Sequence, residues 1–280
     1  MADEDFEGRL DLDRIIATKF KGKKIPGFVV RFFKRFVHQD WMNSILVHGY
    51  KGADFCDDTL ACMDVKIEVE GLENVPRDGT LYTFASNHPL GGVDGLALCS
   101  LITRQFGPMK MLVNDFLLFI RPIEPLCVPI NKVGGQARNL PVLIDEAFRS
   151  GDQLLVFPAG VCSRKIDGKV QDLPWTKTFV KKSVESGRAV VPVHFVGQNS
   201  PRFYRADWFF RKFLKTKFNI PMLFLPDEFY RAQHKTFKII LGKPVPASSF
   251  DNSRTAAQWA DWMREKLYQL SAVWKRSSTR

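Results

Sequence analysis

The chain lacks any apolar run long enough to cross a bilayer. Uninterrupted apolar stretches such as residues 116–120 are far shorter than the roughly 20 residues that a membrane-spanning helix requires. A signal-peptide pattern is also missing, because the first five residues include three acids and no apolar stretch follows them. We therefore expect no membrane-spanning segment, although a protein of this kind can still rest on a membrane surface.

Cysteine is scarce, and none of the five cysteines forms a Cys-x-x-Cys pair. An odd number without paired spacing excludes a disulfide scaffold and indicates reduced thiols in the cytoplasm. Cys56 and Cys62 together with His48 match no common zinc spacing. We therefore expect neither a metal site nor a cofactor.

Several functional signatures are also missing. Without a Gly-x-Ser-x-Gly elbow, a serine hydrolase is disfavoured. The net charge of +11 could suit nucleic acid, but the chain shows no helix-turn-helix, zinc-finger or RNA-recognition signature, so no nucleic-acid partner is expected. At 280 residues with 45% hydrophobic content, the chain can bury a sizeable core as one large domain.

The most informative feature that is present is the segment 88–94, which reads His-Pro-Leu-Gly-Gly-Val-Asp. It follows an apolar run typical of a buried strand and precedes an amphipathic, helix-like stretch. Open α/β sheets bind their ligands at the carboxyl ends of strands, where this loop is expected to lie. His88 held by Asp94 is a standard arrangement for taking a proton from a weak nucleophile near neutral pH. The alternative is that Asp94 only caps the following helix.

Two further strand-like segments carry polar or irregular positions. The run 154–157 leads into a Pro/Gly turn that ends in Arg164 and Lys165, a pair that would suit a phosphate or a carboxylate. The run 189–196 contains Pro192, which cannot donate to a strand ladder. We therefore expect that strand to be bulged or near an edge of the sheet.

In this order the segments resemble the four sequence blocks of the glycerolipid acyltransferase superfamily, which includes the lysophosphatidate acyltransferases. Block one, His-x4-Asp, is matched by His88 and Asp94 with one extra residue between them. Block two aligns loosely with residues 128–132. Block three, Phe-Pro-Glu-Gly-Thr-Arg-Ser, is matched by residues 157–160 together with Ser163 and Arg164. Block four is the Val-Pro-Val run 191–193, and the resemblance covers residues 65–245.

The chain departs from these blocks on the side that holds the acceptor. The family's block-three glutamate is Ala159 here, and its block-two arginine is Lys132. Lysine cannot reproduce the bidentate fork with which arginine binds phosphate. The pattern is similar to a divergent bacterial branch of the superfamily that acts on ornithine- or glycine-lipid precursors. A lipid acyltransferase is therefore a firmer expectation than a lysophosphatidate-specific enzyme.

The resemblance implies acyl transfer from an acyl-carrier protein or acyl-CoA to the hydroxyl of a lyso- or mono-acylated lipid. His88 would be the general base and Asp94 would orient it. Backbone N–H groups near Gly91 and Gly92 are candidates for the oxyanion site. The substrate would be held by five residues of blocks two and three: Lys132, Gly160, Ser163, Arg164 and Lys165.

The alternation of strand-like and helix-like segments predicts an α/β fold, with a mixed, largely parallel sheet flanked by helices. Residues 61–280 would form the catalytic domain, after an N-terminal helical arm over residues 1–60. The expected strands are 64–70, 80–86, 109–113, 126–130, 153–158, 189–196 and 236–241; the expected helices are 28–47, 95–104, 136–149, 175–186 and 255–274.

Two regions combine basic and aromatic residues. Seven basic residues and no acid lie between Lys19 and Arg35, beside an apolar stripe at helical spacing: Val29, Phe32, Phe33, Phe36 and Val37. Residues 201–215 have the same character. An anionic membrane surface is the expected partner, which suggests a peripheral position on the inner face of the cytoplasmic membrane. The alternative is that the stripe packs on the catalytic domain.

Three other classes stay open from the sequence. One is a hydrolase with Cys162 or Ser163 as nucleophile and His88 as base. Another is a lipid-binding protein without catalytic activity. The third is a nucleic-acid-binding protein, which the charge alone would favour.

Overall fold

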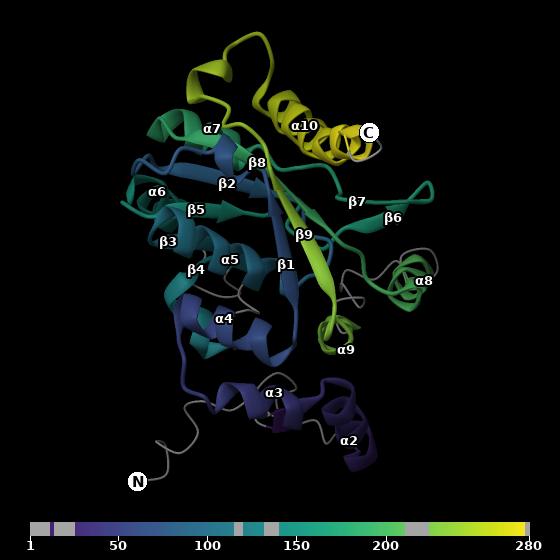
Figure 1. Ribbon diagram of the computed structural model, residues 1–280. Coiled ribbons are helices and arrows are strands. Elements are labelled where there is room, and N and C mark those ends of the chain that lie inside the picture. Colours follow the sequence, from purple (N-terminus) through teal and green to yellow (C-terminus); the bar gives the residue numbers. More distant parts are fainter. Residues whose placement is uncertain (1–11, 14–25, 115–119, 132–139, 211–223, 278–280) are drawn as a thin grey trace.

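The fold is seen in a computed structural model that describes residues 12–13, 26–114, 120–131, 140–210 and 224–277. Its centre is a seven-stranded sheet with the strand order β1-β9-β8-β2-β5-β3-β4 (Figure 1). All neighbouring strands are parallel except β8 and β9, which are antiparallel. The strands are β1 (Lys66–Glu70), β2 (Tyr82–Ser86), β3 (Met109–Asn114), β4 (Cys127–Asn131), β5 (Gln153–Val156), β8 (Ala189–Val196) and β9 (Thr236–Leu241). The prediction of a mixed, largely parallel α/β sheet is confirmed.

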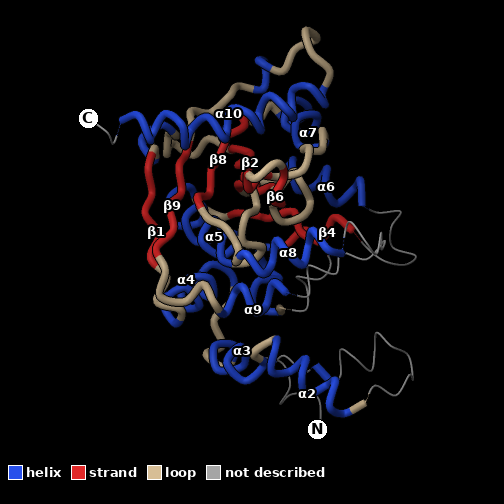
Figure 2. Tube along the Cα trace, turned by 90° about the vertical axis from the view of Figure 1, so that its right-hand side faces the viewer, coloured by secondary structure: helices blue, strands red, loops and turns tan. Residues whose placement is uncertain are grey.

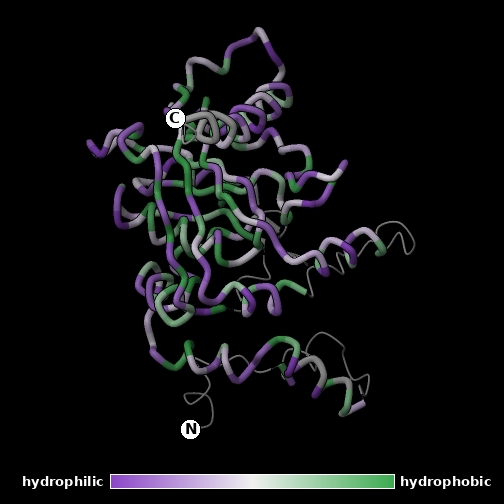
Figure 3. The backbone as a smooth tube through the Cα atoms, turned by 45° about the vertical axis from the view of Figure 1, so that its right-hand side comes forward, coloured by the Kyte–Doolittle hydropathy of each residue, from purple (hydrophilic) through white to green (hydrophobic). Residues whose placement is uncertain are grey.

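Helices cover both faces of this sheet, because its central strands are apolar on both sides. Neighbouring residues of β2 show the alternation: Phe84 belongs to the core on one face and Ala85 to the core on the other. The first core includes α4 (Gly52–Cys62) and α5 (Val93–Phe106), and the second includes α7 (Thr178–Ser186) and α10 (Ala256–Ser277). Figure 3 shows the hydrophobic residues gathered along the strands between these helices.

Helix α6 (Leu140–Arg149) packs against β4 and α7. This segment is the described part of the predicted helix 136–149. It carries Pro141 near its start, where the missing N–H of proline costs no helical hydrogen bond. Short 3-10 helices at Leu72–Asn74, Arg121–Leu126 and Ala247–Ser249 connect the larger elements. A small hairpin of β6 (Arg164–Ile166) and β7 (Lys169–Gln171), which the pattern did not predict, follows β5.

The prediction for the proline strand is partly wrong. Strand β8 lies inside the sheet, between β2 and β9, rather than at an edge. Its pairing with β9 begins only at Val193, and Val190 instead forms an isolated bridge with Val245. Pro192 lies between these two contacts, where the ladder to β9 is interrupted because proline has no N–H to donate. Its carbonyl still accepts a hydrogen bond from the N–H of Gly242, at 2.9 Å.

The single predicted helix 28–47 is divided into two helices in the structure. They are α2 (Gly27–Phe36) and α3 (Gln39–Leu46), and His38 between them has a left-handed backbone with φ of 52°. Its imidazole stacks on Tyr230 at 3.8 Å between ring centroids, and its Nε2 lies 2.9 Å from Asp227. These contacts join the arm to α9 (Leu225–Tyr230), which lies beside α8 (Pro201–Phe209) in Figure 2.

Helix α4 was not predicted, and it packs with the catalytic core. Phe55, Cys56 and Leu60 are buried in the same cluster as residues of the sheet and of α5. Residue 60, the predicted boundary between arm and core, lies inside this helix. Among the described residues, no helix is both long and apolar enough to cross a membrane.

Candidate active site

The loop after β2 carries His88. The residue just before the histidine, Asn87, binds this loop to the neighbouring strand. The side chain of Asn87 donates to the carbonyl of Phe195 and accepts from the N–H of the same residue, at 2.9 and 2.8 Å. Because Phe195 is in β8, this pair fixes the carboxyl end of β2 to that strand. The site thus lies at the carboxyl edge of the sheet, where the sequence placed it.

His88 and Asp94 form the expected pair. The imidazole Nδ1 lies 3.0 Å from a carboxylate oxygen of Asp94, and the histidine ring stacks on Phe157 at 4.1 Å between centroids. The Asp94 side chain is fully buried, whereas 17% of the His88 side chain is exposed. No group of the described residues forms a hydrogen bond with Nε2 of His88, so this nitrogen is available to a substrate hydroxyl.

Asp94 also organises the loop itself. Its carboxylate accepts hydrogen bonds from the N–H groups of Leu90, Gly91, Gly92 and Gly95, at 2.9 to 3.3 Å. The alternative role as a helix cap is therefore real, but it accompanies the contact with His88 instead of replacing it. Such a set of donors stabilises the ionised carboxylate in spite of its burial.

The electrostatic balance of the pair follows from these contacts. Burial lowers the pKa of His88, but the charge of Asp94, its hydrogen bond and the more distant charge of Asp172 outweigh burial and raise that pKa overall. Burial raises the pKa of Asp94, but His88 and the backbone donors outweigh it, so that pKa lies below its ordinary value. The pair therefore favours a carboxylate beside an imidazole that can hold a proton.

The N–H groups of Gly91 and Gly92 are used by Asp94, at 3.3 and 3.0 Å. Both groups are thus already engaged by a carboxylate, and their oxyanion role stays a prediction that this geometry disfavours. The glycines are needed for space instead. A Cβ on Gly91 would lie 2.4 Å from the Cys162 sulfur, and one on Gly92 would lie 2.8 Å from the Phe229 ring.

The block-three turn lies beside this loop, and its N–H at Ser163 donates to the carbonyl of His88 at 2.8 Å. Ser163 is buried and Arg164 is 4% exposed. The Arg164 guanidinium lies 3.0 Å from Asp207 and donates to the carbonyl of Cys162. The charge of Arg164 is thus already balanced within the protein. That Arg164 binds a substrate anion stays a prediction, and this geometry disfavours it.

The other expected substrate-binding residues differ in their positions. Gly160 and Lys165 are exposed, and Gly160 has the left-handed φ of 69° that the turn requires. Lys165 is thus the basic residue of this turn that faces solvent. Lys132 lies outside the described residues. The structure therefore brings His88, Asp94 and Ser163 together and leaves Lys165 as the accessible cation.

Asp172 was missed by the sequence analysis, although it lies in the same network. It is fully buried, and its side chain accepts hydrogen bonds from Ser163 at 2.5 Å and from the N–H of His88 at 3.3 Å. Burial raises the pKa of Asp172, against the lowering effect of hydrogen bonds from Ser163 and Trp175. An isolated acid after a basic hairpin gives no local signal of such a role.

The geometry also disfavours a covalent nucleophile in the turn. Burial, with the charge of Asp94, raises the pKa of the Cys162 thiol to about 12, so the reactive thiolate is scarce at neutral pH. The hydroxyl of Ser163 donates to Asp172 rather than to His88. Neither side chain is activated by the histidine, as a hydrolase of this kind would require.

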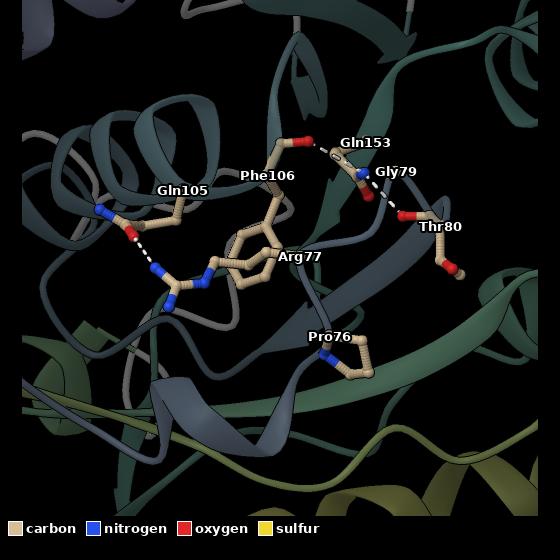
Figure 4. Close-up of a pocket in the computed structure, with 7 residues that line it drawn as sticks. All are labelled: Pro76, Arg77, Gly79, Thr80, Gln105, Phe106 and Gln153. Carbon is tan, nitrogen blue, oxygen red and sulfur yellow. Dashed lines mark hydrogen bonds between the residues drawn. The ribbon is translucent and has the colours of Figure 1, made fainter.

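Two other features lie away from this edge. A cavity of about 160 Å³ is lined by Arg77, Thr80, Gln105 and Gln153 at the amino ends of β2 and β5 (Figure 4). There Gln153 donates to the carbonyls of Thr80 and Phe106, which is a structural role. His48, Asp58 and Cys62 bring possible ligand atoms within 4.8 Å of one another on the protein surface. Cys56, considered with them from the sequence, is buried elsewhere in the core.

In this α/β fold a buried carboxylate holds a histidine at the carboxyl edge of a largely parallel sheet. Comparison with known proteins names the class: the family model described as acyltransferase matches residues 14–275. The chain belongs to this acyltransferase family and is an acyltransferase enzyme, which confirms the resemblance drawn from the four blocks.

Two relatives are similar over nearly their whole length. The lyso-glycine lipid O-acyltransferase of Bacteroides thetaiotaomicron is 48% identical over 266 residues, which cover 93% of this chain and 97% of the relative. The protein of the same name from Phocaeicola vulgatus is 45% identical and is covered to 95%. Among solved structures, the 1-acyl-sn-glycerophosphate acyltransferase PlsC from Thermotoga maritima has a TM-score of 0.50 at 19% identity, covering 92% of this chain and 93% of that one. That likeness supports the fold.

Proposed function

We propose that the protein is a lipid O-acyltransferase whose acceptor is a lyso-glycine lipid, with a fatty acyl thioester as donor. The observation that carries the proposal is the His88–Asp94 pair, with Nε2 open to substrate, in a chain that is 48% identical to a lyso-glycine lipid O-acyltransferase. The donor is an acyl-carrier protein or acyl-CoA. Both are acidic, and a chain with a net charge of +11 attracts acidic partners.

The reaction takes place in one displacement. Nε2 of His88 accepts the proton of the acceptor hydroxyl while its oxygen attacks the thioester carbonyl carbon. Asp94, which is bonded to Nδ1, stabilises the imidazolium that forms. The carbon–sulfur bond then breaks, and the leaving thiolate takes the proton from His88. The products are an ester and a free thiol, and the enzyme returns to its starting state without an acyl-enzyme.

The acceptor preference follows from the block-three turn. Ala159 stands where the family has a glutamate, and Arg164 is paired with Asp207, so Lys165 is the exposed cation of this turn. One lysine suits a single carboxylate, such as that of an acylated glycine, better than it suits a doubly charged phosphate. A hydroxyacyl glycine offers both this carboxylate and the hydroxyl that is acylated.

A side-by-side assay tests the acceptor. Purified protein should acylate a 3-hydroxyacyl glycine with a kcat/KM at least about tenfold above that for lysophosphatidate, because a mismatched polar group costs this much or more. Each acceptor should be paired with acyl-carrier protein and with acyl-CoA, so that the donor is identified in the same experiment. Efficient turnover of lysophosphatidate, with none of the acyl glycine, would instead indicate phosphatidate synthesis.

The enzyme is proposed to work at the cytoplasmic face of the membrane, since its acceptor is a lipid. Three large apolar side chains support this position: Phe28 is 69% exposed, Trp208 is 52% exposed and Phe209 is 49% exposed. They lie on α2 and α8, near basic residues that would attract anionic lipids. By contrast, Phe36 contacts Phe224 and Arg202, which is a packing role. Val29, Phe32 and Phe33 have side chains outside the described set.

Replacing Phe28, Trp208 and Phe209 with serine should weaken binding to anionic vesicles by at least about fivefold, because less apolar area enters the bilayer. Higher salt should weaken wild-type binding further. Turnover of a soluble short-chain acceptor should stay unchanged. Val184 on α7 is 44% exposed and provides a matched control as Val184→Ser. Equal losses on soluble and membrane-embedded acceptors would assign these side chains to folding.

A further inference from the structure

Behind the histidine lies a carboxylate that the mechanism above does not use. Asp172 is fully buried, and its side chain accepts hydrogen bonds from three donors. Oδ1 accepts from the His88 N–H at 3.3 Å and from the Ser163 hydroxyl at 2.5 Å, and Oδ2 accepts from the Trp175 indole at 2.9 Å. Contacts made entirely by donors suit a carboxylate, which can only accept.

The main chain of Asp172 is held as firmly as its side chain. Its N–H donates to the hydroxyl of Tyr268 at 2.8 Å, and its carbonyl accepts from Arg264 at 3.0 Å. Both partners lie on α10, 96 and 92 residues further along the chain. The residue therefore has a fixed position that is set by a long helix rather than by its own loop.

The contacts of Asp172 join the two segments that make the site. The N–H of Ser163 donates to the carbonyl of His88, and Asp172 binds both the hydroxyl of Ser163 and the N–H of His88. The backbone of His88 is thus held on its N–H and on its carbonyl, while Asp94 holds its ring. An imidazole aimed by three fixed points has little freedom to turn away from the acceptor.

We propose that Asp172 is a positioning residue, which fixes the main chain of His88 against the Ser163 turn and so aims Nε2 at the acceptor hydroxyl. This inference rests on the proposed function of His88 as general base. Asp172 does not touch the reacting atoms. It acts on kcat through the placement of the base, and misplacement of a catalytic group by about 1 Å can cost on the order of 10² in rate.

Asp172→Ala should lower kcat about 10²-fold and leave KM within about twofold, because the acceptor contacts are elsewhere. Asp172→Asn keeps one acceptor oxygen, but its amide group then faces the Trp175 N–H, donor against donor. Adding Trp175→Phe removes that clash, so the double variant should recover part of the activity lost in Asp172→Asn. Trp175→Phe alone is the reference for this recovery.

The pH profile separates positioning from general structural support. The charged groups that act on His88 are Asp94, Asp172 and Arg164. Asp172→Asn removes one negative charge, so the acid limb of kcat/KM should move to lower pH in Asp172→Asn and in the double variant. A residue that only supports the fold would leave this limb in place. Asp251, which also accepts from a serine hydroxyl and a backbone N–H, provides Asp251→Asn as a matched control with unchanged activity.

Thermal unfolding of each variant accompanies the kinetics, and His88→Ala is included in every assay. The proposal would be overturned if Asp172→Asn and the double variant both kept the wild-type kcat and the wild-type acid limb. It would also be overturned if the loss of kcat in each variant matched the loss of folded protein. If His88→Ala is inactive in that experiment, the base assignment survives while the role of Asp172 fails. If His88→Ala remains active, the proposed function itself fails.

Discussion

His88→Ala should lower kcat/KM for acyl transfer by on the order of 10²–10⁴, the usual contribution of a positioned general base. The reason is geometric: Nδ1 is bound to the buried Asp94, and Nε2 is the ring nitrogen left for the acceptor hydroxyl. Steady-state kinetics with a 3-hydroxyacyl glycine and an acyl thioester measure the effect. The melting temperature should change little, since the substitution leaves in place the hydrogen bonds with which Asn87 and Asp94 hold the loop.

The wild-type pH profile provides a second readout. The base must be neutral, and Asp94 raises the pKa of His88 against the lowering effect of burial. Activity should therefore rise with pH through a pKa above that of ordinary histidine, about 6.5. His234, which pairs with Asp64 on the surface, gives His234→Ala as a matched control with normal kinetics. Wild-type turnover by His88→Ala would exclude the mechanism.

Asp94→Asn should also lower kcat/KM, by a factor on the order of 10²–10⁴. The substitution changes only one carboxylate oxygen into an amide group. An asparagine amide can donate to Nδ1 of His88 and favour the tautomer that carries its proton on Nε2, where the acceptor proton must go. The same amide would face N–H groups of the glycine loop, which now donate to the carboxylate.

A loss of stability is therefore expected together with the loss of activity. Leaving buried donors without an acceptor costs about 1–3 kcal/mol for each group. Urea unfolding should show this as a lower midpoint for Asp94→Asn than for His88→Ala. Asp58, which pairs with His48 on the surface, gives Asp58→Asn as the control. Full activity in a folded Asp94→Asn would show that Asp94 is a cap and nothing more.

Much of the sheet and the contact between His88 and Asp94 were accessible from the sequence because their signals are local. Short apolar runs that end in Pro/Gly turns marked the buried strands, and the spacing of His88 and Asp94 lies within one loop. The helix break at His38 was missed because its cause is tertiary. The left-handed backbone there is accompanied by a ring stack on Tyr230, far along the chain.

The substrate side was harder to predict for the same reason. Arg164 has the position of an anion-binding residue in the family blocks, but Asp207 from α8 neutralises it. Asp172 joins His88 across 84 residues of sequence, a contact that no periodicity or motif reveals. The oxyanion role of Gly91 and Gly92 stays a prediction, and the sequence does not tell that Asp94 accepts from both N–H groups.

The strand order has a consequence for how the chain is completed on the ribosome. The strands around His88, namely β2, β5 and β8, are neighbours in the sheet, and all have been synthesised once residue 196 is made. Among the described strands β1 is made first, yet its partner β9 is made last, so β1 must wait for its partner until residue 241 has been synthesised.

The supports of Asp172 arrive later still. Arg264 and Tyr268 lie on α10 and emerge after every strand of the sheet. A nascent chain can therefore assemble the edge that carries the histidine while its final anchor is still inside the ribosome. Because domains fold as units during synthesis, this order delays the complete site until residue 268 has left the ribosome.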